Sequence, residues 1–176
     1  MPIALFPAAS YQVQTEVIFR ELRTELRRLL PDARIEHIGA SSIPGAVSKG
    51  NLDLCVAVPA QDFLHTRQQI EALGFSPQDG ELAAPQRCNL HASHYAVHVV
   101  VQLIETGSEH ESLFTFRDAL LNEPQLVAVY NAIKRESAPL DEQTYLENKA
   151  AFIRSVLAST ATDATSVNPM PSPTAF

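Results

Sequence analysis

Two adjoining stretches decide the fold, His37-Ile38-Gly39-Ala40-Ser41-Ser42-Ile43-Pro44-Gly45 and, a few residues later, Leu52-Asp53-Leu54-Cys55-Val56. The residues before the loop, 34–38, alternate between polar and apolar types, as a half-buried strand does. The nearly continuous apolar run 52–58 is typical of a strand that is buried on both faces. We therefore expect two strands that are joined by a loop of small residues, in which glycine permits positive φ and close backbone approach.

The loop also carries groups that can bind an anion. Ser41 and Ser42 offer hydroxyls and backbone amides, and successive amides in a turn form a concave anion site. The loop therefore predicts a phosphate site. The alternative is that its glycines serve only a tight connection between the two strands.

Asp53 interrupts an otherwise apolar strand. A buried carboxylate without a partner costs several kcal/mol, so Asp53 must meet a cation or hydrogen-bond donors. Two interpretations stay open at this point. Asp53 is either an acid at a ligand site or a structural acid that the loop satisfies.

The rest of the chain is mostly helical in pattern. Apolar residues at helical spacing predict helices over residues 12–30, 62–73, 108–121, 124–136 and 141–158. The arginines of the first of these segments are expected on its solvated face. A turn is predicted at 76–80, and β-branched residues predict a further strand at 94–104. This order predicts an α/β (α+β) fold with a mixed sheet, flanking helices and a helical C-terminal third.

Length and composition favour one domain. The chain has 176 residues, of which 45% are hydrophobic, enough to bury one core. From Ser159 the composition shifts to Ala, Ser, Thr and Pro. We therefore predict a domain over residues 1–158 and a disordered tail over 159–176.

Several classes of protein are disfavoured. The formal net charge of -7 argues against binding of nucleic acid through overall basic charge. Apolar stretches such as 96–103 are far shorter than the roughly 20 residues that span a bilayer. The first residues lack the positive segment of a secretory signal, so we expect a cytoplasmic protein without a membrane segment. Cys55 and Cys88 have no CxxC spacing and are expected to be free thiols.

The loop and the strand resemble the signature of a known family, the GrpB family. That signature reads E-H-I-G-S-T-S-V-P-G followed by K-P-I-I-D-I, and here it stands as Glu36-His37-Ile38-Gly39-Ala40-Ser41-Ser42-Ile43-Pro44-Gly45 and Lys49-Gly50-Asn51-Leu52-Asp53-Leu54. The resemblance continues through Leu73-Gly74-Phe75, Gly80-Glu81-Leu82, Pro85, Arg87, Phe116-Arg117-Asp118, Leu120, Tyr130, Lys134, Tyr145, Lys149, Phe152 and Ile153. It runs from about Phe6 to Leu157 and implies a nucleotidyltransferase-like fold.

In that superfamily a Gly-Ser pair holds the triphosphate, and an acid-x-acid pair on the next strand holds divalent metal. Hard cations need oxygen ligands and neutralise the phosphoryl oxygens during attack. The resemblance thus implies Asp53 as a catalytic acid and as the ligand of Mg²⁺. The set is incomplete, because Ala40 replaces the serine, Cys55 replaces the second acid, and the strand expected to carry a third acid, 97–104, has no carboxylate.

The family also places a histidine on the strand before its Phe-Arg-Asp segment. The local pattern assigns this position to His98, whereas counting back from Gly107 without a gap assigns it to Gln102. We prefer His98, as a general acid or base or as an ordinary structural residue. A zinc site of His91, His94 and His98 is not expected, since His91 is out of phase with the other two.

Basic residues complete the site that the resemblance implies. The residues expected to bind substrate or phosphate are Gly39, Ser41, Ser42, Lys49 and Arg117. Arg117 either braces the sheet through an ion pair with Asp118 or binds an anion with its guanidinium fork. Lys149 is expected to pair with Tyr145, with phosphate binding as the alternative, and Arg87 is expected at the surface.

Two functions follow from this reading. The first is a pocket for a nucleotide or another phosphorylated small molecule, with Mg²⁺-dependent nucleotidyl or related group transfer in which Asp53 and His98 act. The second is a catalytically degenerate nucleotidyltransferase fold that only binds a ligand or a protein.

Overall fold

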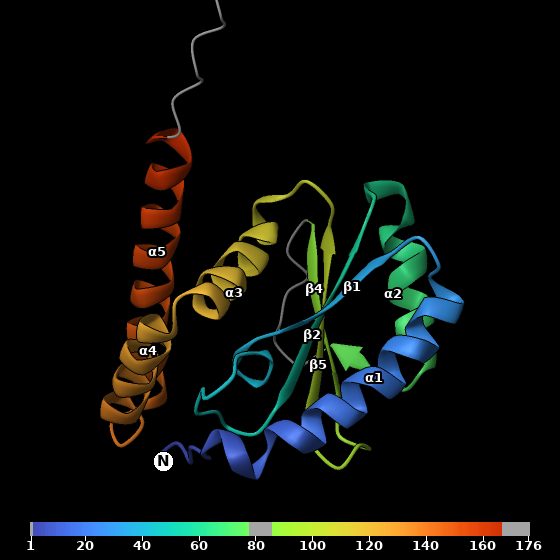
Figure 1. The fold of residues 1–176 in the computed structure, drawn as a ribbon. Coiled ribbons are helices and arrows are strands. Elements are labelled where there is room, and N and C mark those ends of the chain that lie inside the picture. The colour runs from blue at the N-terminus through green and yellow to red at the C-terminus, as the bar shows by residue number, and fades with distance from the viewer. Residues whose placement is uncertain (1, 78–85, 167–176) are drawn as a thin grey trace, which may run out of the picture.

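The computed structural model describes residues 2–77 and 86–166, which form a mixed sheet between two groups of helices (Figure 1). The strands are β1 (Arg34–Ile38), β2 (Leu52–Val58), β3 (Ser76–Pro77), β4 (Arg87–Ala92) and β5 (Val99–Glu105). The α-helices are α1 (Gln12–Leu29), α2 (Phe63–Ala72), α3 (Ser112–Asn122), α4 (Pro124–Ser137) and α5 (Glu142–Ser166). Ser76 and Pro77 of the predicted turn at 76–80 form β3 instead, and the rest of that turn, together with Gly80-Glu81-Leu82 and Pro85, lies outside the described residues.

The sheet has the strand order β1-β2-β5-β4-β3. β2 and β5 are parallel, and the other neighbouring strands are antiparallel. The register pairs Asp53 with Ile38 on one side and with Val100 on the other. Asp53 therefore lies on a central strand, as its apolar neighbours predicted.

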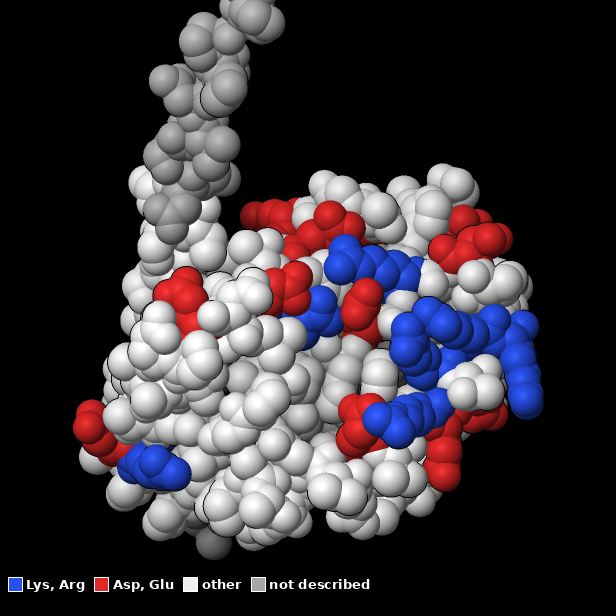
Figure 2. Space-filling model, viewed as in Figure 1, with Lys and Arg blue, Asp and Glu red and all other residues white. Residues whose placement is uncertain are grey.

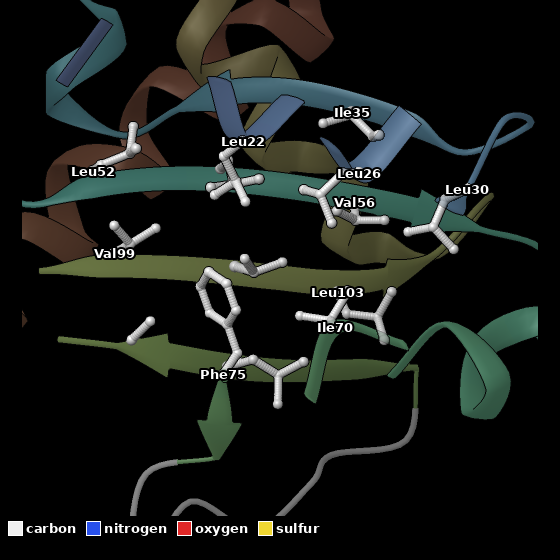
Figure 3. Close-up of a cluster of buried hydrophobic side chains, with 14 of the residues drawn as sticks. Leu22, Leu26, Leu30, Ile35, Leu52, Val56, Ile70, Phe75, Val99 and Leu103 are labelled. Atoms are coloured by element: carbon white, nitrogen blue, oxygen red, sulfur yellow. The ribbon is translucent and has the colours of Figure 1, made fainter. Parts of the chain in front are cut away.

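One face of the sheet carries the larger core. Side chains of β2 alternate, so that Leu52, Leu54 and Val56 join this core while Asp53 and Cys55 point to the opposite face. Figure 3 shows how the core is assembled from α1, α2 and the strands; the labelled residues are Leu22, Leu26, Leu30, Ile35, Leu52, Val56, Ile70, Phe75, Val99 and Leu103. Burial of this apolar area against α1 and α2 holds the sheet from one side.

The other face lies toward α3, α4 and α5 (Figure 1). Phe116 of α3, Tyr130 of α4 and Phe152 of α5 pack together, with the Tyr130 and Phe152 rings stacked at 5.2 Å between centroids. The same cluster includes Ile43 and Ala46 from the loop between β1 and β2. These helices and the loop therefore form one packed unit beside the sheet.

The structure corrects several predicted elements. The predicted strand over 94–104 begins only at Val99, because residues 93–98 form the connection from β4. Tyr95 and Val97 of that connection pack against the core, which gave it a strand-like apolar pattern. β4 was not predicted, and among the apolar residues whose spacing predicted the first helix, Val13, Val17 and Leu29 are exposed.

Helix α5 continues to Ser166, eight residues beyond the predicted end of the domain. The prediction of a disordered tail is therefore wrong for residues 159–166, and residues 167–176 lie outside the described part of the chain. Ala, Ser and Thr of this segment continue the helix because none of them breaks it, and the prolines come only later in the sequence.

In Figure 2, charged side chains of both signs lie mainly over the upper and right-hand parts of the face, with a basic group at the right, on the α1 side, and much of the rest is uncharged. Of the arginines on α1, Arg20 pairs with Glu16 at 2.7 Å, and Arg27 and Arg28 are exposed. Arg27 and Arg28 thus lie on the predicted solvated face, whereas Arg23 is half-buried, with its guanidinium 5.8 Å from the centroid of the Phe19 ring. Across the described ranges, the helices lack a segment that is both long and apolar enough to span a membrane.

We expect that deletion of residues 161–176 leaves the melting temperature within about 2 °C of that of the full chain. The last buried side chain described on α5 is Val156, so this deletion removes little buried apolar area. Thermal unfolding followed by circular dichroism measures the difference. Deletion from residue 154, which also removes Val156 and Leu157, is the control and should lower the melting temperature by more than about 4 °C. Equal melting temperatures of the two truncated chains would contradict the conclusion that the packed part of α5 ends near Val156 and Leu157.

Candidate functional site

A cavity of about 440 Å³ lies between the sheet and the second group of helices. It is bounded by the loop after β1, by the face of β2, β4 and β5 that carries Asp53, and by α3, α4 and α5. Its lining residues are Ile38, Gly39, Ala40, Ile43, Val47, Ser48, Lys49, Asn51, Asp53, Arg87, Gln102, Leu113, Phe116, Arg117, Tyr130, Lys134, Tyr145, Lys149 and Ile153. The segment that the sequence singled out therefore forms one wall of the cavity.

The loop after β1 begins with a close contact between Gly39 and Asp53. Gly39 has φ +68° and ψ -172°, a region that is essentially restricted to glycine. A Cβ atom at this position would lie 2.6 Å from Asp53 Oδ2. The backbone can therefore pass over Asp53 only because residue 39 has no side chain.

Neighbouring helices hold the rest of the loop. From the start of α1, the Tyr11 hydroxyl donates to the Ala46 carbonyl oxygen at 2.6 Å. From α4, Asn131 accepts a hydrogen bond from the Val47 amide at 2.8 Å, and the Lys134 ammonium donates to the Val47 carbonyl oxygen. The loop is thus fixed from two sides, as a preorganised site requires.

The two loop serines are used inside the loop. The Ser41 hydroxyl lies 2.9 Å from Nε2 of His37, and the Ser42 hydroxyl donates to the Gly39 carbonyl oxygen at 2.8 Å. Neither serine lines the cavity, whereas Gly39 and Ala40 do. Of the loop residues predicted to bind phosphate, the geometry thus brings Gly39 to the cavity and directs both serine hydroxyls elsewhere.

His37 is a packed structural residue. Its ring stacks on Phe19 at 4.7 Å, and its Nδ1 lies 3.3 Å from a carboxylate oxygen of Glu16 on α1. Burial lowers the pKa of His37, and the Glu16 carboxylate opposes this shift. The histidine of the motif therefore joins β1 to α1 and is not among the cavity-lining residues.

Asp53 lies on the wall of the cavity that β2 forms. Its side chain is half-buried, and burial raises its pKa, while the positive charges of Lys149 and His91 act to lower it. Asp53 therefore lies in the field of cationic groups and lines the cavity directly beside the Gly39 turn. Whether it is an acid of a ligand site or a structural acid stays a prediction from the sequence.

Of the metal-binding acids that the resemblance implied, the described part of the chain presents Asp53 to the cavity. Cys55, two residues along β2, is fully buried among apolar side chains, and burial raises the pKa of its thiol to about 12. Gln102 of β5, the register partner of Cys55, lines the cavity with a neutral amide. Among the described residues, no three His, Cys, Asp or Glu side chains are grouped to hold a metal ion. The donor set therefore does not fit the Mg²⁺ ion that the resemblance implied.

His98 lies just before β5 and does not line the cavity, whereas the alternative, Gln102, does. The Nε2 atom of His98 lies 3.1 Å from Nδ1 of His91 on β4. Burial and the neighbouring His91 both lower the pKa of His98. The hairpin of β4 and β5 brings the two histidines together across seven residues of sequence, which strand phase alone did not predict.

Arg117 is both a structural residue and a lining residue. Its guanidinium donates to a Glu36 carboxylate oxygen at 3.1 Å, to the His37 carbonyl oxygen at 3.0 Å and to an Asp118 carboxylate oxygen at 2.8 Å. These contacts fasten α3 to the end of β1, while part of the side chain lines the cavity. Arg87 was expected at the surface but is half-buried and lines the cavity from β4.

Two lysines on the covering helices face the same space. Lys134 is only 1% exposed, and its ammonium lies 4.1 Å from the centroid of the Tyr130 ring. Burial lowers the pKa of Lys134 to about 7, and the charge of Lys149 adds to this effect. Burial also lowers the pKa of Lys149, while Asp53 acts to raise it. The sequence analysis assigned no role to Lys134, although a lysine among apolar residues of a helix is a usable signal.

Tyr145 lies between two of the ammonium groups. Lys49 and Lys149 each place Nζ 5.4 Å from the centroid of its ring. The predicted pairing of Tyr145 with Lys149 is thus present, and Lys149 lines the cavity as well. Lys49 itself is exposed and lies 3.5 Å from a carboxylate oxygen of Glu142.

Comparisons with known proteins agree with this architecture. The family model described as GrpB protein matches residues 8–159. A UPF0157 protein of Vibrio cholerae is 40% identical over 152 residues, which cover 86% of this chain and 80% of that protein. The crystal structure of the conserved protein GrpB from Enterococcus faecalis matches with a TM-score of 0.75 and 22% identity, over 93% of this chain and 100% of the other.

A more distant likeness concerns the fold alone. The Cid1 poly(U) polymerase matches with a TM-score of 0.50 and 16% identity. The match covers 69% of this chain and 38% of Cid1. The mixed sheet with its flanking helices is therefore nucleotidyltransferase-like, as the sequence predicted.

The substitution Gly39→Ala should destabilise the fold by more than about 3 kcal/mol. Backbone strain in this region costs about 1–3 kcal/mol, and the new methyl group would collide with Asp53. Urea unfolding at constant pH measures the change in the free energy of unfolding. Gly45→Ala is the matched control, because Gly45 also has a positive φ but open space around a Cβ atom. It should cost only about 1–2 kcal/mol. If both substitutions lowered the free energy of unfolding equally, a rigid contact between residue 39 and Asp53 would be contradicted.

Lys134 should make stability rise with pH above neutrality. Below about pH 7 the folded and unfolded chains both carry this proton, and the full cost of burying the charge is present. Between about pH 7 and the ordinary lysine value of 10.5, only the unfolded chain keeps the proton, so unfolding becomes less favourable as pH rises. Urea midpoints measured from pH 7 to 9 should increase in the wild-type protein.

The matched variant for this test is Lys134→Met, which fills a similar volume without a charge. Its urea midpoint should rise less steeply over the same range, the remaining slope coming from groups such as Lys149. Parallel curves for the two proteins would contradict the lowered pKa of Lys134.

Proposed function

This chain belongs to the GrpB family, and we propose that its central cavity binds a phosphorylated small molecule, with a nucleotide as the preferred class. The proposal rests on the charge of the cavity. Among the described residues, the basic side chains that line it are Lys49, Arg87, Arg117, Lys134 and Lys149, and the acidic one is Asp53. A chain with a net charge of -7 thus gathers positive charge in one concave site, where a low-dielectric wall strengthens its attraction for anions.

The basic residues come from separate elements. The loop contributes Lys49, β4 contributes Arg87, α3 contributes Arg117, and the last two helices contribute Lys134 and Lys149. Lys49 and Arg117 each contact a carboxylate of the chain, and Asp53 acts on Lys149, whereas the Lys134 ammonium contacts neutral groups of the described residues. An anion in the cavity would compensate the charge that remains. Phosphate oxygens are the multiply charged acceptors that ammonium and guanidinium groups bind best.

The cavity also accommodates more than a phosphate. Its volume of about 440 Å³ lies within the usual range for small-molecule sites. Apolar side chains, among them Ile43, Leu113 and Ile153, line it beside the charged groups. This combination suits a ligand with one charged end and one larger, less polar part, as a nucleotide has.

The distant likeness to Cid1 supports the nucleotide class. Cid1 structures are described as bound to Mg 3'-dATP and to MgGTP, and as revealing the mechanism of its UTP selectivity. The shared architecture favours a similar location for the ligand, at the face of the sheet that carries Asp53.

Of the two functions, we propose ligand binding in preference to group transfer. Nucleotidyl transfer with Mg²⁺ on Asp53 would need further oxygen ligands, and the neighbouring positions hold the thiol of Cys55 and the amide of Gln102. His98, the residue expected to act as the base, lies against His91 outside the cavity lining. These features favour the degenerate form of the fold, which binds a ligand without two-metal catalysis.

A thermal-shift screen tests the proposal. The panel contains AMP, UMP, ATP, UTP, ribose 5-phosphate and inorganic pyrophosphate, each with EDTA and with Mg²⁺. A compound present at 100 times its Kd should stabilise the protein by about 2.7 kcal/mol, which raises the melting temperature by roughly 5–10 °C at this chain length.

Adenosine and uridine at equal concentration are the controls and should give no shift, since they lack the phosphate. Sodium sulfate at matched ionic strength controls for general salt effects. If no phosphorylated compound raises the melting temperature, or if the nucleosides act equally well, the proposal is wrong.

A further inference from the structure

Lys134 carries the cost of burying a charge, although its ammonium also holds the Val47 carbonyl oxygen of the loop. Lys134 is among the largest fully buried side chains of the described residues, and it lies on α4 beside Ile133 and one turn after Tyr130. Methionine or leucine would fill the same volume without desolvating a charge. An ammonium group in this place therefore points to an anion that enters the cavity.

Lys134 has hydrogen-bonding capacity beyond its contact with the loop. Its ammonium has three donors, and the structure assigns it the Val47 carbonyl oxygen and the face of the Tyr130 ring. Both are neutral groups, so they leave the positive charge uncompensated. The same side chain therefore secures the loop and offers a charge to the cavity.

Lys149 brings a second ammonium to the cavity in which Asp53 is the acidic residue among the described lining residues. It lines the cavity from α5, and its charge and that of Asp53 act on each other. The same positive charge would repel a divalent metal ion on Asp53. Asp53 thus has a cation of the chain in the same cavity, and the described donors do not fit Mg²⁺.

From this arrangement we infer that the cavity binds the phosphate of its ligand without a divalent metal ion, because Lys134 and Lys149 supply the positive charge that metal ions supply in the superfamily. The inference rests on the proposed function and specifies how the ligand is held. Asp53 then acts as the counter-ion of Lys149 in the empty cavity. It does not attract the ligand, since its charge has the same sign as the phosphate.

This role of Asp53 reverses the expected sign of one substitution. In a metal site, Asp53→Asn removes the carboxylate found among the described lining residues and abolishes phosphate binding. In a lysine site, the same change removes a like charge beside the phosphate and frees Lys149. Asp53→Asn should therefore bind phosphate several-fold more tightly than the wild-type chain when EDTA is present.

Isothermal titration calorimetry of the full chain decides between these arrangements. The probes are ATP and inorganic pyrophosphate, each titrated in EDTA and in excess Mg²⁺, and Mn²⁺ alone. We expect at least one probe to bind in EDTA with a Kd no weaker than in Mg²⁺, and Mn²⁺ alone to bind no more tightly than about 1 mM, the range of weak carboxylate sites.

Variants on the two covering helices complete the experiment. Lys149→Met and Lys134→Met should each weaken the probe in EDTA by about tenfold or more, as expected for a lost charge-assisted contact. Lys149→Arg keeps the charge and should retain most of the affinity. Arg154→Met, which removes an exposed charge from the same helix as Lys149, is the matched control and should change the Kd less than twofold. Circular dichroism verifies that each variant is folded.

The outcomes separate this inference from the proposed function. Binding that requires Mg²⁺, or loss of binding in Asp53→Asn together with loss of Mn²⁺ affinity, overturns the lysine site and leaves the proposed function standing. If no phosphorylated compound of the thermal-shift panel raises the melting temperature, both this inference and the proposed function are overturned. Binding in EDTA that depends on both lysines and strengthens in Asp53→Asn supports the inference.

Discussion

The contact between Gly39 and Asp53 is the constraint on which the site depends. β1 and β2 are antiparallel neighbours, and their pairing sets Ile38 beside Asp53 at the end of β1. The chain then turns across Asp53 with a backbone conformation and a clearance that only glycine provides. Everything that follows in the loop, including the carbonyl oxygens bound by Tyr11 and Lys134, takes its position from this turn.

The two faces of the sheet have different roles: one packs into the larger core, and the other forms a wall of the cavity. On β2, Leu52, Leu54 and Val56 pack under α1 and α2, and this face supplies the larger core. The other face carries Asp53 and Cys55, and it is covered by helices that leave a cavity above them. A strand that is buried on both faces can therefore carry one polar residue, because that residue faces a polar cavity instead of packed side chains.

The sequence predicted the fold better than it predicted the site. β1, β2 and four of the helical segments lie close to their predicted places, because their apolar patterns report burial directly. β4 was missed although Arg87, Asn89 and His91 alternate with its buried residues, which is the pattern of a half-buried strand. Local pattern cannot show that polar side chains of a strand face a cavity. It also cannot show that the serines of a motif will bond within their own loop, since this depends on His37 and Gly39 in three dimensions.

Lys134 shows why the part of the site on the covering helices could not be predicted from the sequence. Lys134 stands in a helix beside Tyr130 and Ile133, where a long side chain can equally reach solvent or turn inward. Its inward direction is set by the Val47 carbonyl oxygen, 87 residues earlier in the sequence, which the Gly39 turn brings within reach. The loop and the lysine therefore depend on each other: the loop gives the ammonium a partner, and the ammonium secures the loop. A ligand that compensates this charge would strengthen the same connection, so occupation of the cavity and stability of the fold are coupled through one side chain.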